Sequence, residues 1–375
     1  METAKIDAYI DGLVSRSTPE CTAWNLEKIR EGKKASWNYI DGCMLNALIE
    51  IGHIKNRPDY IDFVESVADY FVCEDGSIRT FDPASQNLDD INEGRILFEL
   101  YRRTGKEKYR LAADYLYQQL QDHPRTPEGN FWHKKIYPNQ IWLDGLYMAQ
   151  PFLALYEMNF GSRDCSDTVN QVKNVHRLMR DNENGLYYHG YDSSRSIFWA
   201  DKTTGCSANL WLRSIGWFSV ALADLIEIVP VGEQRETIKD IFMDLMSSAA
   251  AFSDEETGLY WQVPNMPGRE GNYLETSGSC MLAYAMLKGA RLGILGKEYA
   301  AKGEKTFNGI IDKYLSFHEN GEIGLGGICL VAGLGPESNT RRDGSYEYYI
   351  SEPVVEDDAK GVAPFILCYT EIMRK

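Results

Sequence analysis

The sequence has no apolar run long enough to cross a membrane. None of its stretches approaches the roughly 20 consecutive apolar residues that a transmembrane helix needs. The first residues, Met1 to Asp7, are polar and lack the apolar core of a secretory signal peptide. From these two absences we do not expect an integral membrane protein, and we expect a cytoplasmic location for this chain of 375 residues.

Patterns for metal binding, disulfides and nucleotide binding are missing too. The eight cysteines are scattered without a Cys-x-x-Cys pair, and there are only six histidines. Disulfide scaffolds and structural zinc sites need closely spaced ligands. The glycines Gly324, Gly326 and Gly327 lack the third glycine of a dinucleotide-binding loop, because Cys329 stands at its place. We therefore expect a reduced protein with no metal and no cofactor.

Positive charge is scarce. The chain has 39 Lys and Arg against 55 Asp and Glu, and its net charge is −16. Nucleic acids and anionic membranes both require a basic face, so neither is an expected partner. An acidic small molecule remains possible as a ligand, but it has to meet a locally basic pocket.

The most regular feature that is present is a repeated turn. Its glycines are Gly76, Gly129, Gly185, Gly258 and Gly321, spaced by 53, 56, 73 and 63 residues. Glycine accepts a positive φ cheaply, which suits tight hairpin turns. After each turn an apolar helical run begins, near residues 88, 142, 211, 274 and 358, and a sixth run begins near Trp37 without a preceding turn.

Amphipathic segments alternate with these apolar runs. Tyr60, Phe63, Val64, Val67 and Phe71 lie on one face of a helix, and similar stretches cover about 4–16, 106–124, 165–181, 235–254 and 297–319. Apolar helices belong inside a fold and amphipathic helices outside it. Six such pairs predict an all-α protein, an (α/α)6 barrel or six-hairpin toroid with short β-hairpin turns at its funnel end, in a single domain over residues 1–375. The alternative is an open helical solenoid, which favours shorter and more uniform repeats and needs polar caps.

The segment from Trp132 to Met148 carries the strongest chemical signal. Asp144 stands among aromatic residues, and the basic residues His133 and Lys134 lie just upstream. An apolar surround disfavours the charged form of a carboxyl group, so such an acid can hold its proton near neutral pH. Indole and phenol rings stack on sugars, and anionic sugars need a cation. The segment therefore predicts a pocket for a small acidic oligosaccharide with an acid catalyst at its floor.

Residues in corresponding parts of the other repeats can converge with Asp144 at the funnel. They are Tyr39, Asp89, His189, Trp211 and Arg213. Simpler readings exist, because Asp89 also fits a helix cap and His189 also fits a structural hydrogen bond. Trp211 and Trp217 are six residues apart, near helical spacing, so one of them fits the core, and Trp211 is the better stacking candidate.

Three strings resemble glycoside hydrolase family 105, the unsaturated rhamnogalacturonyl hydrolases. They are His133–Lys134 with Tyr137–Met148, Trp211–Trp217, and Glu275–Cys280. The resemblance runs from about Trp37 to the C-terminus and implies an (α/α)6 barrel. It also implies a substrate from pectin, an unsaturated galacturonic acid linked to rhamnose, with Asp144 as general acid and base and Asp89 as its partner. The pocket positions that it implies are Asn38, Tyr39, His133, Lys134, Tyr137, Gln140, His189 and Arg213.

The sequence departs from the family pattern at several places. Asn38 and Asp41 flank the Tyr39 position, Lys135 and Ile136 follow the His-Lys pair, and the stretch from Leu334 to Gly344 is longer than expected. These departures affect the identity of the second sugar more than the chemistry. Three alternatives stay open: an unsaturated glucuronyl hydrolase acting on glycosaminoglycan fragments, a sugar epimerase, and an oligosaccharide-binding protein without catalytic activity.

Overall fold

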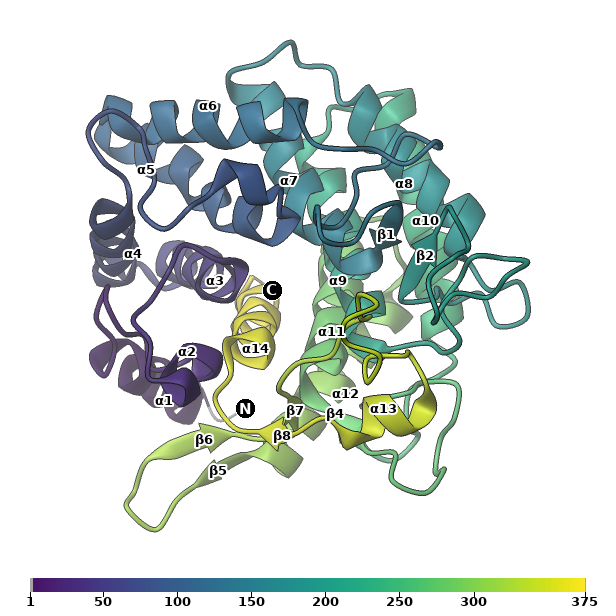
Figure 1. Cartoon of the computed structure of the whole chain (residues 1–375). Coiled ribbons are helices and arrows are strands. Elements are labelled where there is room, and N and C mark those ends of the chain that lie inside the picture. Colours follow the sequence, from purple (N-terminus) through teal and green to yellow (C-terminus); the bar gives the residue numbers. More distant parts are fainter. Residues whose placement is uncertain (1–2, 375) are drawn as a thin grey trace.

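The inner helices of the protein form a closed ring in the computed structural model, which describes residues 3–374 (Figure 1). Each inner helix packs against the next, and the last packs against the first. The inner ring comprises α3 (Tyr39–Lys55), η2 with α5 (Leu88–Arg95 and Ile96–Thr104), α7 (Leu143–Asn159), α9 (Leu212–Ile228), α11 (Thr276–Arg291) and α14 (Ala359–Met373). This closure confirms the (α/α)6 barrel and excludes the open solenoid.

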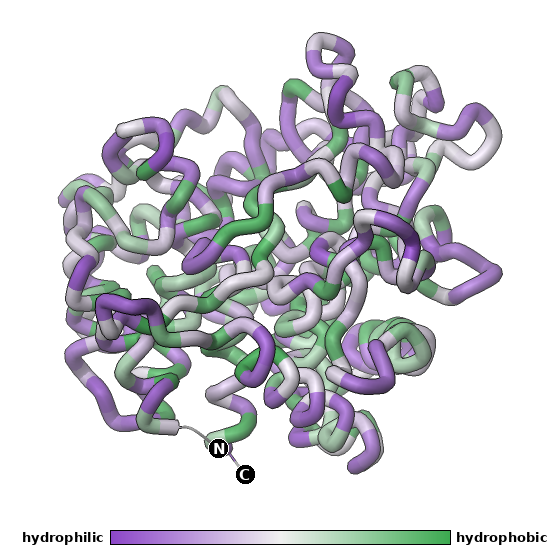
Figure 2. Tube along the Cα trace, turned by 90° about the horizontal axis from the view of Figure 1, so that it is seen from below, coloured by the Kyte–Doolittle hydropathy of each residue, from purple (hydrophilic) through white to green (hydrophobic). Residues whose placement is uncertain are grey.

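A second layer of helices surrounds the ring. It comprises α1 (Thr3–Ser15), α4 (Pro58–Phe71), α6 (Glu107–Gln121), α8 (Ser166–Met179), α10 (Glu233–Ala249) and α12 (Lys297–Tyr314). The inner helices α7, α9, α11 and α14 are buried along most of their length, whereas the outer helices bury one face. Hydrophobic segments accordingly concentrate inside the molecule and hydrophilic segments outside (Figure 2). Within residues 3–374, no helix is long and apolar enough to cross a membrane.

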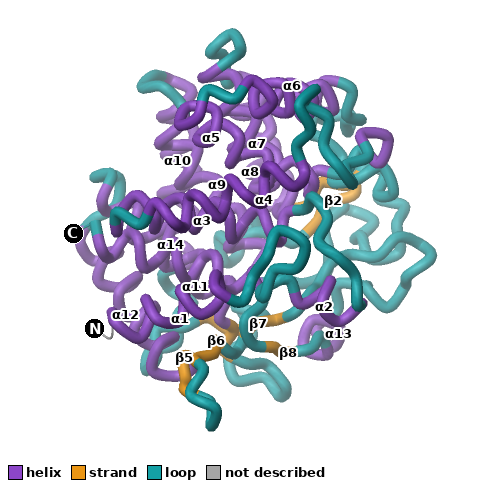
Figure 3. Tube along the Cα trace, turned by 90° about the vertical axis from the view of Figure 1, so that its left-hand side faces the viewer, coloured by secondary structure: helices purple, strands orange, loops and turns teal. Residues whose placement is uncertain are grey.

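The loops and short strands gather at one end of the ring (Figure 3). Four antiparallel pairs lie there: β1 (Gln140–Trp142) with β2 (Gly190–Asp192), β3 (Tyr260–Trp261) with β4 (Leu274–Glu275), β5 (Leu315–Phe317) with β6 (Ile323–Leu325), and β7 (Ile328–Cys329) with β8 (Val354–Val355). The short helices α2 (Leu26–Glu31), η1 (Pro83–Ser85) and α13 (Tyr346–Ser351) complete the chain. The inner helices begin at this end, which we call the funnel end, and they finish at the closed end.

Glycines near the inner-helix starts let neighbouring helices approach closely. A Cβ atom on Gly42 of α3 would lie 2.6 Å from the Cα of Glu93, and a Cβ on Gly278 of α11 would lie 3.0 Å from the backbone of Leu212. All five glycines of the repeated turn have φ between 76° and 100°, as the sequence predicted.

Two details differ from the prediction. The second inner element begins as a 3₁₀ helix over Leu88–Arg95 before it continues as α5, whereas the sequence predicted one apolar helical run from residue 88. Helix α12 ends at Tyr314, and the residues expected to extend it to 319 form β5 and its turn.

Candidate active site

Asp144 is the second residue of α7 and faces the funnel end. The pairing of β1 with β2 brings His189 beside it, because the Leu143 amide donates to the His189 carbonyl at 3.1 Å. The Asp144 Oδ2 atom lies 3.3 Å from the His189 Nε2 atom. Their geometry does not align as a hydrogen bond, and within residues 3–374 neither atom has another hydrogen-bond partner. A buried carboxylate oxygen without a partner is costly, so its position indicates a functional role.

His189 is held from behind by Tyr349. The Tyr349 hydroxyl lies 2.8 Å from the His189 Nδ1 atom, and the imidazole also contacts the rings of Trp211 at 4.7 Å and Trp142 at 5.5 Å. His189 is fully buried. This packing fixes the imidazole so that its Nε2 faces Asp144.

Asp89 occupies the corresponding helical position in the neighbouring repeat, the second residue of η2. Its Oδ2 atom lies 2.5 Å from Lys134 Nζ, and its Oδ1 atom lies 3.6 Å from His133 Nε2. Burial raises the pKa of Asp89, but the charges of Lys134 and His133 outweigh it and lower that pKa below its usual value. Burial lowers the pKa of His133 to about 4. Asp89 is therefore an ionised carboxylate paired with Lys134.

Stacked rings form the wall next to these acids. The Trp142 indole stacks on His133 at 4.4 Å and on Tyr137 at 4.6 Å, and its Nε1 donates to Gln140 Oε1 at 3.1 Å. Three predicted pocket residues, His133, Tyr137 and Gln140, thus come together around Trp142, and their contacts are with its indole. Trp142 retains only 6% of its exposure, so most of this wall supports the site from behind.

The first inner helix contributes Asn38 and Tyr39. Asn38 caps α3, since its Oδ1 accepts a hydrogen bond from the Ile40 amide at 2.8 Å. The backbone amide of Asn38 donates to Glu93 Oε2 at 2.7 Å. Tyr39 is half-buried, and the charges of Asp89 and Arg213 act on it, although burial is the main cause that raises its pKa. Tyr39 therefore lies near Asp89 and Arg213 at the funnel end, and Asn38 caps the helix that carries it.

Arg213 takes the second helical position of α9, equivalent to Asp89 and Asp144. Its Nη1 donates to the Cys329 carbonyl and to Ser277 Oγ at 3.4 Å, and its Nη2 donates to the Leu330 carbonyl at 3.4 Å. The side chain is 1% exposed. Arg213 thus anchors the backbone that follows β7.

The two tryptophans of α9 lie in different surroundings. Trp211 stacks on Tyr349 at 6.0 Å and contacts His189, whereas Trp217 stacks on Tyr147 at 4.6 Å inside the core. Trp211 is 1% exposed and Trp217 is 3% exposed. Trp211 belongs to the wall around His189, and Trp217 lies nearly two turns further from the funnel.

Sequence reasoning missed Tyr349 and Glu93. Tyr349 belongs to the aromatic run Tyr346–Tyr349, which could have signalled a funnel wall. Burial raises the pKa of Glu93 well above its usual range, and nothing in its sequence context indicates that it holds the Asn38 amide. Within residues 3–374, no group of three or more His, Cys, Asp or Glu side chains is arranged to hold a metal ion.

Comparisons with known proteins agree with this geometry. The model of Glycosyl Hydrolase Family 88 matches residues 9–375. The structure of a family 105 glycoside hydrolase from C. acetobutylicum ATCC 824 is similar with a TM-score of 0.91 at 36% identity, covering 100% of this chain and 99% of that chain. The unsaturated rhamnogalacturonyl hydrolase YesR of Bacillus subtilis (strain 168) is 25% identical over 295 residues, 77% of this chain and 78% of YesR. An unsaturated glucuronyl hydrolase from Bacillus sp. GL1 shares the fold, with a TM-score of 0.68 at 14% identity over 98% of this chain and 95% of that chain.

Proposed function

Because the chain belongs to the glycosyl hydrolases of families 88 and 105, we propose that it hydrolyses unsaturated galacturonyl-rhamnose oligosaccharides derived from pectin. The observation that carries this proposal is the environment of Asp144, a buried acid whose Oδ2 has no hydrogen bond within the described chain and faces only His189. The named activity of YesR supports the choice of substrate.

A single acid suffices for this substrate. Most glycosidases need two carboxyl groups across the glycosidic bond, but an unsaturated uronide is an enol ether and reacts at its double bond. In the proposed reaction Asp144 gives its proton to C4, and the ring oxygen stabilises the cation that forms at C5. A water molecule then adds to C5 and returns a proton to Asp144. The resulting hemiketal opens, and the bond to the second sugar is lost in that rearrangement.

The two acids differ in their suitability as the proton donor. Asp89 is held ionised by Lys134 at 2.5 Å, and its lowered pKa leaves it without a proton to give. Within residues 3–374, Asp144 forms no ion pair with Lys or Arg, and its Oδ2 atom lies 3.3 Å from His189 Nε2. We therefore assign proton transfer to Asp144, and we assign the orientation of the attacking water to Asp89, which acts as a hydrogen-bond acceptor.

Competition between two disaccharides tests the substrate. Purified protein is mixed with unsaturated galacturonyl-rhamnose and an unsaturated glucuronyl disaccharide from a glycosaminoglycan, and the loss of the double bond is followed by ultraviolet absorbance with product analysis. We expect a higher kcat/KM for the galacturonyl-rhamnose disaccharide. Preference for the glucuronyl disaccharide would overturn the substrate, and binding without loss of absorbance would overturn the activity.

A further inference from the structure

The segment between β7 and α13, residues 331–345, forms the 331–345 loop, which includes the stretch Leu334–Gly344. The loop is tied to the β2 side of the funnel, because Trp199 Nε1 donates to the Gly335 carbonyl at 3.2 Å and Asn209 Nδ2 donates to the Gly344 carbonyl at 2.9 Å. Leu334 is fully buried in a cluster with Trp142 and Trp199. The loop is therefore a packed part of the funnel wall.

Both ends of this loop meet the residues around Asp144. The Gly333 amide donates to the Tyr348 hydroxyl at 3.0 Å, and a Cβ on Gly333 would lie 3.4 Å from the Trp142 ring. A Cβ on Gly344 would lie 3.7 Å from the hydroxyl of Tyr349, the residue that holds His189. Side chains that project from this loop are thus within reach of a ligand at the funnel.

Arg342 is the side chain of interest. A Cβ on Gly333 would lie 3.2 Å from the Nη1 atom of Arg342. Because the same Cβ would lie 3.4 Å from the Trp142 ring, the Arg342 guanidinium is close to that indole. Arg342 is half-buried. Among residues 3–374 its guanidinium has no carboxylate within ion-pair distance and no hydrogen bond, while its neighbour Arg341 is paired with Glu352 at 2.7 Å.

The other cations of the site are already engaged. Lys134 is paired with Asp89 at 2.5 Å, and both terminal nitrogens of Arg213 donate to backbone carbonyls of Cys329 and Leu330. A protein of net charge −16 repels an anionic ligand unless an uncompensated cation lies at the site. Arg342 supplies such a cation in a planar fork that matches a carboxylate.

We propose that Arg342 binds a uronate carboxylate of the substrate and thereby selects acidic oligosaccharides. This inference rests on the proposed function for the identity of the ligand. The carboxylate has two possible sources: the unsaturated uronate whose double bond reacts, or the next uronate in a longer fragment. A disaccharide contains only the first of these carboxylates, and a tetrasaccharide of alternating uronate and rhamnose contains both.

Binding to a catalytically silenced protein tests the proposal without relying on turnover. Full-length Asp144→Asn protein is titrated calorimetrically with the unsaturated disaccharide and tetrasaccharide, alone and combined with Arg342→Gln. A lost charge-assisted hydrogen bond weakens binding by about 10- to 100-fold. Weakening for both ligands assigns Arg342 to the unsaturated uronate, and weakening for the tetrasaccharide alone assigns it to the next uronate.

Arg341→Gln is the matched control, since it removes the same charge from the adjacent position, where the side chain is 57% exposed. We expect it to change either affinity by less than about twofold, because the Arg341 guanidinium is already paired with Glu352 and is not free to bind a carboxylate of the ligand. Arg342→Lys should retain part of the affinity, because it keeps the charge without the fork. A methyl ester of the disaccharide removes the carboxylate, so Arg342→Gln should no longer weaken its binding if the unsaturated uronate is the source.

If Arg342→Gln binds both oligosaccharides as tightly as the parent Asp144→Asn protein does, the proposal is wrong. It is also wrong if Arg342→Gln and Arg341→Gln weaken binding equally, because that result would show long-range electrostatics only. Thermal unfolding checks the fold, and we expect an unchanged Tm, since the Arg342 side chain makes no hydrogen bond within the described residues. Failure of the proposed function is a separate result, namely that wild-type protein leaves the double bond of both ligands intact.

Discussion

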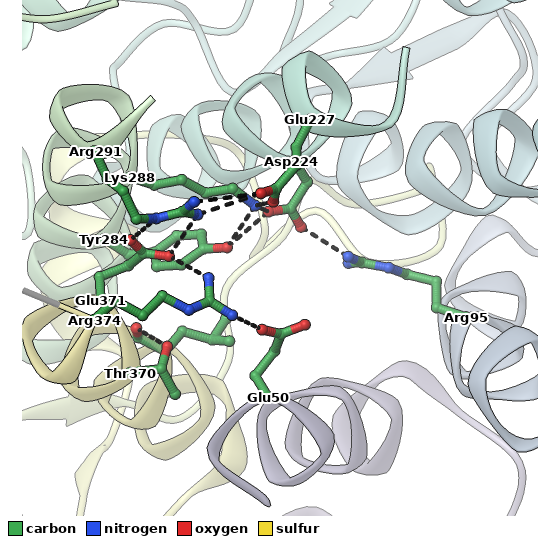
Figure 4. Close-up of polar contacts among 11 residues, drawn as sticks. Glu50, Arg95, Asp224, Glu227, Tyr284, Lys288, Arg291, Thr370, Glu371 and Arg374 are labelled. Carbon is green, nitrogen blue, oxygen red and sulfur yellow. Dashed lines mark hydrogen bonds and ion pairs between the residues drawn. The ribbon is translucent and has the colours of Figure 1, made fainter. Parts of the chain in front are cut away.

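Two buried aspartates at opposite ends of the same ring have very different surroundings. At the closed end, Asp224 accepts hydrogen bonds from Lys288 Nζ and the Tyr284 hydroxyl at 2.8 Å and from Arg95 Nη2 at 2.7 Å (Figure 4). At the funnel end, the Asp144 Oδ2 atom lies 3.3 Å from His189 Nε2 and accepts no hydrogen bond from residues 3–374.

The difference follows from the direction of the helices. The inner helices end at the closed end, where the carbonyl groups of their last turns favour cations, so a buried acid there requires several positive partners. Burial raises the pKa of Asp224, but Lys288 and Arg95 outweigh it and lower that pKa to about 2. The inner helices begin at the funnel end, where an acid is tolerated with fewer partners. The ring therefore uses one acid for stability and can leave another free for chemistry.

The largest effect that we predict is the loss of activity in Asp144→Asn. An amide cannot deliver a proton to C4, and general acid–base catalysis typically contributes about 10²–10⁴-fold, so kcat should fall by that factor. The measurement is the loss of ultraviolet absorbance of the unsaturated disaccharide. Thermal unfolding should show an unchanged or higher Tm, because Asp144 makes no ion pair with a Lys or Arg among residues 3–374. If the variant keeps full activity, Asp144 is not the proton donor. If its Tm falls strongly, Asp144 stabilises the fold as Asp224 does.

The next effect is the loss of stability in Asp224→Asn. Arg95 would keep its charge in a buried place without its counterion, and Lys288 would keep only the half-exposed Glu227 at 2.8 Å among the described residues. Breaking a buried pair in this way costs about 3–5 kcal/mol. Urea unfolding should show a lower midpoint at an unchanged m value. Glu74→Gln is the control, because Glu74 is 89% exposed and pairs with Lys108 at the surface.

A double variant sharpens this test. Asp224→Asn with Lys288→Met removes one cation together with its carboxylate, so it should recover part of the lost stability. A single variant as stable as the wild type would show that the network at the closed end contributes nothing to folding.

A smaller effect concerns the second acid of the funnel. Lys134→Gln removes the charge that, together with His133, lowers the pKa of Asp89, so that pKa should rise. If an ionised Asp89 is required, activity is lost as the pH falls through this pKa, and the acidic limb of the kcat/KM profile should move to higher pH. Lys135→Gln is the matched control, because Lys135 is exposed and donates only to the Ala84 carbonyl. An acidic limb that stays in place in Lys134→Gln would exclude Asp89 from the reaction.

The sequence predicted the scaffold better than the contacts. Glycine turns and alternating helix types located all six inner-helix starts to within about two residues, and the family resemblance is confirmed by the comparisons. Local patterns determine these features. The contacts of the site join distant residues. Arg213 binds the Cys329 carbonyl 116 positions away, and His189 contacts the Tyr349 hydroxyl 160 positions away. No local sequence pattern predicts such pairs.

The smallest predicted effect is the acid dependence of stability at the closed end. The pKa of Asp224 falls from 3.8 to about 2 on folding, which corresponds to about 2 kcal/mol. Because the folded pKa is lowered, this contribution is fully present above pH 3.8 and is lost as the pH falls toward 2. The stability difference between wild type and Asp224→Asn, measured by urea unfolding at pH 6, 4 and 3, should therefore shrink at the lowest pH. A difference for Asp224→Asn that stays constant down to pH 3 would mean that Asp224 contributes through packing and neutral hydrogen bonds, and the contrast between the two ends would then lie in shape instead of charge.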